Sequence, residues 1–196
     1  MKKSVLISLI VVALIGICVV WAVGRYNTMV TLQENVENAW GQVQNQYQRR
    51  ADLIPNLVAT VKGYAKQEME TYTAVQEARS KATQITIDPS HITPEQLTAF
   101  QQAQGELSQA LGRLLAVAEA YPELHANVDF LKLMDQLEGT ENRTTYARNI
   151  FNEEAKAFNT FIRRFPNNII ASMFGFEKKP YFEAEESAQK APKVEF

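Results

Sequence analysis

The sequence predicts an all-α protein, in which an N-terminal transmembrane helix precedes an elongated, mostly antiparallel four-helix bundle. Residues 5–23 are apolar and uncharged over a length that can cross a bilayer. From residue 36 onward, apolar side chains recur in alternating steps of four and three, which keeps one helix face turned toward partner helices, as in a coiled coil. The 196 residues include one cysteine, so no intrachain disulfide can form and helix packing must supply the stability.

The apolar N-terminal segment is expected to be an uncleaved signal-anchor. As a helix, Val5 to Val23 spans roughly 28 Å, close to the ~30 Å of a hydrocarbon core. Trp21 and Tyr26 fall where aromatic residues line a membrane interface. A cleaved signal peptide would have a shorter apolar core and a small-x-small cleavage site. A lipoprotein signal would have a small residue before Cys18, where this chain has Ile17.

The charges that flank this segment predict its orientation. Lys2 and Lys3 precede it, whereas Arg25 stands alone after it and is followed by Glu34 and Glu37. The positive-inside rule then places the N-terminus in the cytoplasm. In a bacterium, the chain would be a single-pass protein of the inner (plasma) membrane with its bulk in the periplasm or outside the cell. We therefore expect a cytoplasmic N-terminus (1–4), a transmembrane helix (5–24), a bundle (25–176) and a polar, flexible tail (177–196).

The charge balance of the part beyond the membrane argues against nucleic acid as a partner. After residue 25 the chain carries 17 basic and 22 acidic side chains, a net charge of −5. Binding to phosphates requires a clustered basic face. No such cluster is evident in the sequence.

The first helix of the bundle is predicted to run from about Thr28 to Ala82. Its apolar stripe crosses Pro55 without a missed step, and a helical hairpin needs a loop of about two residues or more, so we expect a kink here and not a reversal. Arg50 and Glu68 interrupt the stripe where an apolar side chain is expected. Residues 83–93 lose the period and contain a turn signal, which predicts the first reversal there.

The second helix has a well-defined start. Thr93 is the predicted N-cap, Pro94 takes the first helical position, and Gln96 completes a capping box. The apolar phase slips by one residue at Tyr121–Pro122, which favours a real break and four helices. If this proline only kinks the chain, three long helices result.

The third helix is expected to be short, from 122 to 138, and the fourth to end at Phe165. Gly139 would cap the third helix and Thr140 would begin the fourth. Ala147, Phe151, Phe158, Phe161 and Phe165 form the predicted core face of the fourth helix. With four helices running out, back, out and back, residues 165–176 would finish near the membrane.

Several motifs carry a family resemblance. They include Trp40, the run Arg49-Arg50-Ala51-Asp52-Leu53-Ile54-Pro55-Asn56-Leu57-Val58, Val61-Lys62-Gly63-Tyr64-Ala65, Arg113-Leu114-Leu115-Ala116-Val117-Ala118-Glu119-Ala120-Tyr121-Pro122, Thr140-Glu141-Asn142, Phe165-Pro166-Asn167-Asn168, Phe174-Gly175-Phe176 and Tyr181-Phe182-Glu183. Together they resemble the signature of the LemA family of bacterial membrane proteins. The resemblance implies a bromodomain-like, up-and-down four-helix bundle and a role in the cell envelope, and it implies no reaction.

The sequence predicts neither a catalytic centre nor a cofactor or metal site. His91 and His125 have no cysteine or second histidine at ligand spacing. The di-iron sites of four-helix bundles use Glu-x-x-His pairs on two helices, and the sequence has none. It also has no glycine-rich phosphate loop and no Gly-x-Ser-x-Gly elbow. We therefore expect a protein that is not an enzyme.

Two segments are candidate interaction sites. The first is the charged cluster Arg49, Arg50 and Asp52. Arg50 is interpreted as one half of an ion pair across the bundle, with Glu119 or Glu154 as its partner. The alternative is a notch at the Pro55 kink that binds an acidic peptide or a lipid head group.

The second candidate is the C-terminus, where Val194 and Phe196 alternate with polar residues before the free carboxylate. Domains that add a strand to a sheet accept such an extended segment. The alternative is that both side chains fold back onto the bundle.

These expectations indicate the class of function but not the partners. We expect a membrane-anchored, extracytoplasmic scaffold or adaptor that acts through protein–protein association and forms a homo-oligomer, with other envelope proteins as further partners. The alternative is an envelope sensor whose bundle binds a small molecule or a lipid.

Overall fold

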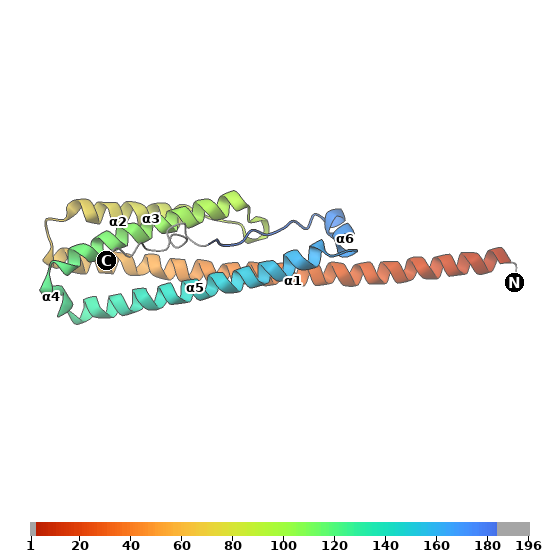
Figure 1. Ribbon diagram of the computed structural model, residues 1–196, viewed down its shortest axis with the longest axis horizontal. Helices are drawn as coiled ribbons and strands as arrows, with labels where there is room; N and C mark the ends of the chain where they lie inside the picture. Colours follow the sequence, from red (N-terminus) through yellow and green to blue (C-terminus); the bar gives the residue numbers. More distant parts are fainter. Residues whose placement is uncertain (1–2, 184–196) are drawn as a thin grey trace, which may run out of the picture.

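A computed structural model describes residues 3–183 of the chain, and this part is all-α with no strand. In chain order its elements are α1 (Lys3–Tyr64), α2 (Met69–Gln84), the 3₁₀ turn η1 (Pro89–His91), α3 (Pro94–Glu119), α4 (Pro122–His125), α5 (Val128–Arg163) and α6 (Asn167–Phe174). The four long helices α1, α2, α3 and α5 alternate in direction (Figure 1). The N-terminal part of α1 extends far beyond the other helices (Figure 1).

The prediction that the helix continues through Pro55 is confirmed, because α1 runs without interruption for 62 residues. Its apolar N-terminal part is exposed and is the one stretch among residues 3–183 that is long and apolar enough to cross a membrane. Beyond it, the predicted stripe is buried through Val36, Trp40, Val43, Tyr47, Arg50, Ile54, Leu57 and Val61.

The prediction that this helix continues to Ala82 is wrong. The chain reverses between Ala65 and Glu68, and α2 returns along α1 toward its apolar N-terminal part (Figure 1). This turn takes up four residues, close to one helical turn, so the stripe passes from α1 into α2 with its spacing intact. The buried Tyr72 donates its hydroxyl to the Ala65 carbonyl at 2.5 Å and ties the start of α2 to the end of α1.

The predicted start of α3 is confirmed. The Gln96 backbone N–H donates to Thr93 Oγ1 at 3.2 Å, and the Thr93 backbone N–H donates to Gln96 Oε1 at 3.1 Å. The predicted break at Tyr121–Pro122 is also observed, since α3 ends at Glu119 and a separate short helix begins at Pro122.

The predicted boundary at Gly139 and Thr140 is wrong, because both residues lie inside α5. A glycine in a helix interior costs about 1 kcal/mol relative to alanine, which tertiary packing can offset. Thr140 is fully buried and donates its hydroxyl to the Gln136 carbonyl at 2.7 Å, so its side chain supports the helix that it was expected to begin.

The core divides into two apolar clusters along the long axis. The cluster nearer the apolar N-terminal part of α1 is centred on Trp40, Phe151 and Phe158, and the distal cluster on Ile54, Leu107 and Leu114. The predicted core face of the fourth helix is therefore correct for most of its members. It is wrong for Phe165, which follows the end of α5 and is 82% exposed.

After α5, the chain stays at the same end of the bundle in α6 and then runs back along the helices (Figure 1). Pro166 lies at the N-cap of α6, and Gly175 ends this helix with a left-handed φ of 74°, a conformation that favours glycine. Residues 177–183 then follow as an extended segment, here called the strap. The expectation of a flexible tail is wrong for the strap, because Lys179 and Phe182 are buried in it.

Candidate functional site

A hollow lies between α1, the η1 corner and the chain that leaves α6, at the end of the bundle next to the apolar part of α1. Its volume is about 530 Å³. Its lining combines aromatic, acidic, hydroxyl and basic side chains from these three segments, among them Tyr26, Gln33, Glu34, His91, Thr93, Phe176 and Lys179. The hollow therefore presents both apolar and polar surface next to the exposed apolar part of α1.

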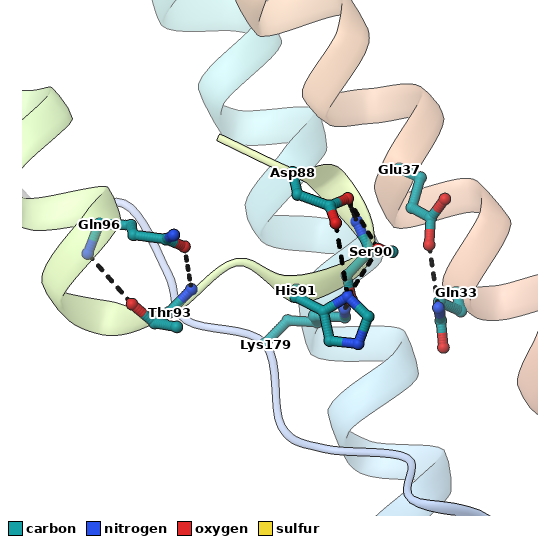
Figure 2. Close-up of polar contacts among 8 residues, drawn as sticks. All are labelled: Gln33, Glu37, Asp88, Ser90, His91, Thr93, Gln96 and Lys179. Atoms are coloured by element: carbon teal, nitrogen blue, oxygen red, sulfur yellow. Dashed lines mark hydrogen bonds and ion pairs between the residues drawn. The ribbon is translucent and has the colours of Figure 1, made fainter. Parts of the chain in front are cut away.

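The η1 corner forms one wall of this hollow (Figure 2). Asp88 accepts hydrogen bonds from the Ser90 N–H at 2.9 Å and from Ser90 Oγ at 2.7 Å. These bonds from Ser90 hold the pKa of the Asp88 carboxyl below its usual value. His91 Nδ1 lies 2.7 Å from Ser90 Oγ and 3.5 Å from Asp88 Oδ2, so the corner is a self-contained polar turn.

Lys179 joins the strap to this corner. Its side chain is among the few buried charged groups, with the residue 5% exposed, and its ammonium group donates to the Ser90 carbonyl (Figure 2). Burial lowers the pKa of Lys179, and Glu37, Asp88 and Glu177 oppose that shift. Because the ammonium group is already bonded to the backbone, Lys179 acts as a latch between two segments and not as a free cation.

Two asparagines of α5 hold the strap in place. Asn159 Nδ2 donates to the Lys179 carbonyl at 2.8 Å, and the Lys179 N–H donates back to Asn159 Oδ1 at 2.8 Å. Asn152 repeats this pattern with Phe182, at 3.0 and 2.8 Å. The two asparagines are seven positions apart, which places them on one face of α5.

The sequence did not predict this pair of asparagines, here called the clamp (Asn152 and Asn159). An available signal was the amide side chain of Asn159 inside the apolar stripe between Phe158 and Ile162, where a buried polar group requires a partner. Asn152 gave a weaker signal because it lies at the border of the stripe.

The end of the strap inserts an aromatic ring into the core. Phe182 stacks on Trp40 with ring centroids 5.9 Å apart and planes inclined by 16°, and it meets the edge of Phe151 at 5.3 Å. The Arg148 guanidinium lies 5.0 Å from the centre of the same ring. Gln101 and Arg148 both donate to the Glu183 carbonyl, so α3 and α5 both hold the end of the described chain.

The structure separates the members of the predicted charged cluster. Arg50 is buried, as expected for an ion pair across the bundle, but its partner is not Glu119 or Glu154. Arg50 Nη1 lies 3.2 Å from Glu141 Oε2, and Nη2 donates to Ser108 Oγ at 2.9 Å. The position of Arg50 in the apolar stripe directs its side chain toward α5. Which carboxylate of α5 it meets depends on where the loops and helix boundaries place that helix along α1, and this residue is Glu141.

Arg49 and Asp52 lie on the surface of α1, where Asp52 accepts from Gln48 Nε2 at 2.8 Å. Their part in binding a partner stays a prediction. Val194 and Phe196 lie outside the described residues. His91 is in the η1 corner and His125 in α4, and residues 3–183 contain no group of three or more metal-ligating side chains.

Comparisons with known proteins agree with the motifs of the sequence. The profile of the LemA family matches residues 39–196, which confirms the predicted resemblance. Magnetosome protein MamQ 2 of Paramagnetospirillum magneticum is 29% identical over 176 residues, covering 81% of this chain and 65% of the relative. Magnetosome protein MamQ of Magnetospirillum gryphiswaldense is 27% identical over 175 residues, covering 81% and 64%.

A further relative carries the family's own name. Protein LemA of Metamycoplasma hominis is 26% identical over 172 residues, covering 88% of this chain and 75% of the relative. The chain spans about 65% of the length of the MamQ relatives that it matches. None of these names states a reaction.

Proposed function

Because this chain belongs to the LemA family, we propose that it is a single-pass membrane protein whose helical domain acts as an extracytoplasmic scaffold. The alternating directions of α1, α2, α3 and α5 support an up-and-down four-helix bundle as its architecture. In this proposal the N-terminus is cytoplasmic, and the bundle associates with further copies of the chain or with other envelope proteins.

The observation that carries this proposal is the unbroken course of α1. One helix contains both the exposed apolar segment and the buried stripe of the bundle, with no linker between them. From Gly24 to Tyr64 it extends for roughly 60 Å at 1.5 Å per residue. A bundle joined to its anchor in this way presents its far end at a set distance from the bilayer, which suits a spacer or scaffold.

The far end carries apolar side chains that a partner could cover. Tyr64, Val128 and Leu131 are exposed there. Asn127 Nδ2 donates to the Tyr64 hydroxyl at 2.9 Å, which brings the end of α1 and the start of α5 together. We therefore place the main protein–protein contact at this tip.

A photo-crosslinking experiment in intact membranes tests the contact. A photoreactive residue at Leu131 should give a product with a second copy or with another envelope protein, identified by mass spectrometry. The matched control is Lys132, which is exposed on the next position of the same helix and forms an ion pair with Asp129 at 3.9 Å. Equal yields at both positions, or intramolecular products alone at Leu131, would refute a contact at the tip.

The orientation has its own test. Protease added to intact spheroplasts should digest the bundle when the N-terminus is cytoplasmic. A bundle that is cleaved only after lysis would reverse the proposed topology and leave the scaffold role to be placed in the cytoplasm.

The 530 Å³ hollow favours one second candidate, a sensor that binds a small amphipathic molecule or a lipid. Its walls come from α1, the η1 corner and residues 174–179, so a ligand there would contact three segments at once. Native mass spectrometry of the protein released from membranes should then show a bound molecule that Val30→Trp displaces. A spectrum of the unliganded mass alone would remove this candidate.

A further inference from the structure

Helix α6 is apolar on more of its circumference than the protein covers. Its inner face buries Asn167, Ile170 and Ala171 against the bundle. On a second face, Ile169 and Met173 are four positions apart and exposed, with Met173 72% exposed. Phe165, just before the helix, and Phe174, its last residue, are further exposed apolar side chains. Apolar side chains that project from two faces of one helix require an apolar environment on both faces.

The third face of the same helix is different. Asn168 and Ser172 are exposed and polar, and helical geometry centres this pair roughly a quarter-turn from the pair Ile169 and Met173. The exposed side of α6 is thus divided into an apolar stripe and a polar stripe. This division indicates an environment that is apolar in one direction and polar in the other.

The position of α6 identifies that environment. The Phe174 ring lies 4.8 Å from the Tyr26 ring, and the Phe176 ring lies 5.6 Å from it. Tyr26 follows the uncharged run that ends at Val23, about one helical turn beyond the segment proposed to cross the bilayer. Helix α6 therefore lies beside α1 at the level where α1 would leave the hydrocarbon core (Figure 1).

Cationic side chains lie on the polar side of α6 and on α1 just beyond its apolar part. Arg25 lies 5.6 Å from the centre of the Trp21 ring and 5.9 Å from that of Phe161. Arg163 and Lys178 line a hollow of about 550 Å³ together with Asn168 and Ser172, on the polar face. Arg164 is exposed directly before α6, whereas Glu177 is an acidic side chain of the same hollow. This arrangement of cations beside an apolar face is typical of helices that bind anionic membrane surfaces.

We propose that α6 is a second membrane contact, which lies in the interface of the bilayer that α1 crosses. Ile169, Met173, Phe174 and Phe165 enter the boundary between head groups and acyl chains, and Arg163 and Lys178 face lipid phosphates. A single helix leaves the bundle free to tilt and rotate at the membrane, and a second contact beside it sets one orientation. The occupant of the apolar face is the phospholipid, and the proposal rests on α1 as the membrane anchor.

Depth-dependent quenching in the full chain tests the proposal. The protein is placed in nanodiscs of phosphatidylcholine and phosphatidylglycerol that contain a lipid with a doxyl quencher near the head group. Single cysteines at Ile169, Met173, Asn168 and Ser172 are introduced in a Cys18→Ser background and labelled with an environment-sensitive fluorophore. The native Cys18, labelled in the unmodified chain, reports on the transmembrane segment, and Lys132→Cys reports a site in water.

The expected result is a pattern that follows the faces of the helix. Labels at Ile169 and Met173 should be blue-shifted and quenched, whereas labels at Asn168 and Ser172 should be quenched much less. Introducing Met173→Asp should shift the label at Ile169 toward the water value while the melting temperature of the bundle stays unchanged. Replacing phosphatidylglycerol by phosphatidylcholine should weaken the quenching at Ile169.

Other outcomes would overturn the proposal. Labels at Ile169 and Met173 that behave like the one at Lys132 would place the face in water. Labels that are blue-shifted but not quenched by lipid would show a protein partner in place of the bilayer. If Cys18 itself escapes quenching, the membrane anchor fails first, which distinguishes failure of the proposed function from failure of the α6 contact alone.

Discussion

Removing the amide of Asn159 should release the strap and destabilise the core cluster around Trp40. Asn159 is buried and forms hydrogen bonds to both backbone groups of Lys179 and to the Tyr181 hydroxyl at 3.0 Å. In Asn159→Ala the Lys179 N–H and C=O would lose their partners. Each buried polar group left without a partner costs about 1–3 kcal/mol.

The loss cannot exceed the free energy with which the strap docks on the bundle. When the cost of the unpaired groups exceeds the free energy of docking, the strap detaches and its backbone returns to water. We therefore expect a loss of about 2–4 kcal/mol, which corresponds to a fall in Tm of roughly 5–15 °C for a chain of this size. The Phe182 ring should leave the Trp40 contact at the same time.

Asn159→Asp separates hydrogen bonding from packing, because the two side chains have nearly the same shape. An ionised carboxylate can still accept from the Lys179 N–H, but it faces the Lys179 carbonyl with a second acceptor. Burial raises the pKa of the introduced carboxyl above its unfolded value of about 3.9. The native state then binds the proton more tightly, so the stability of the variant is greatest below the unfolded pKa and is lost as pH rises through the folded pKa.

Denaturant unfolding in detergent, with hydrogen exchange of residues 177–183, measures both effects. The control is Asn149→Ala, since Asn149 is exposed on the same helix. The deficit of Asn159→Asp relative to the unmodified protein should shrink between neutral and acidic pH, and the deficit of Asn159→Ala should not. A loss below about 0.5 kcal/mol for Asn159→Ala, with the strap still protected, would refute the clamp as a stabilising device.

Three further predictions follow from other contacts. Arg50→Ala should lower the free energy of unfolding by about 1–3 kcal/mol, because packing and the hydrogen bond to Ser108 are lost, whereas Glu141→Gln should cost under about 1 kcal/mol because the Glu141 side chain is 54% exposed. Denaturant unfolding of both variants measures this difference, and equal losses would contradict the assignment. Tyr72→Phe should cost about 1 kcal/mol, because it removes the 2.5 Å bond to the Ala65 carbonyl and leaves only the 3.4 Å bond from the Glu68 N–H. Faster hydrogen exchange at residues 65–68 should accompany the loss, and unchanged exchange there would show that the turn does not depend on this bond. Burial lowers the pKa of Lys179, so the unfolded state binds more protons than the native state between that lowered pKa and the ordinary value of 10.5, and the free energy of unfolding should rise with pH in this range. Lys179→Met should remove this part of the rise, and a pH profile that Lys179→Met leaves unchanged would refute the assignment.

The sequence alone determined the features that depend on local spacing and chemistry. The uncharged run from Val5 to Val23, the stripe from Val36 to Val61 and the capping box at Thr93 are each contained within a few turns of helix, and all three appear in the structure as a candidate span, a buried face and a helix start. The family could be predicted for the same reason, because its motifs are short segments of sequence.

Only the tertiary structure decided where the long helices turn. The turn at Ala65–Glu68 preserves the apolar phase, so periodicity could not distinguish it from a continuous helix. Gly139 and Thr140 have the local signals of a helix boundary, yet α5 continues through them because its buried face packs against α1 on both sides of that point.

The candidate site also depended on contacts between distant segments. Asn152 and Asn159 bind backbone groups about twenty to thirty residues further along the chain, and Lys179 bonds to Ser90, 89 positions away. The partner of Arg50 could be predicted only by kind, since a carboxylate was required but its level along α5 depended on the loops between the helices. Periodicity determines which face of a helix is buried, whereas hydrogen-bond partners depend on how the helices are placed in register by turns that the period does not encode.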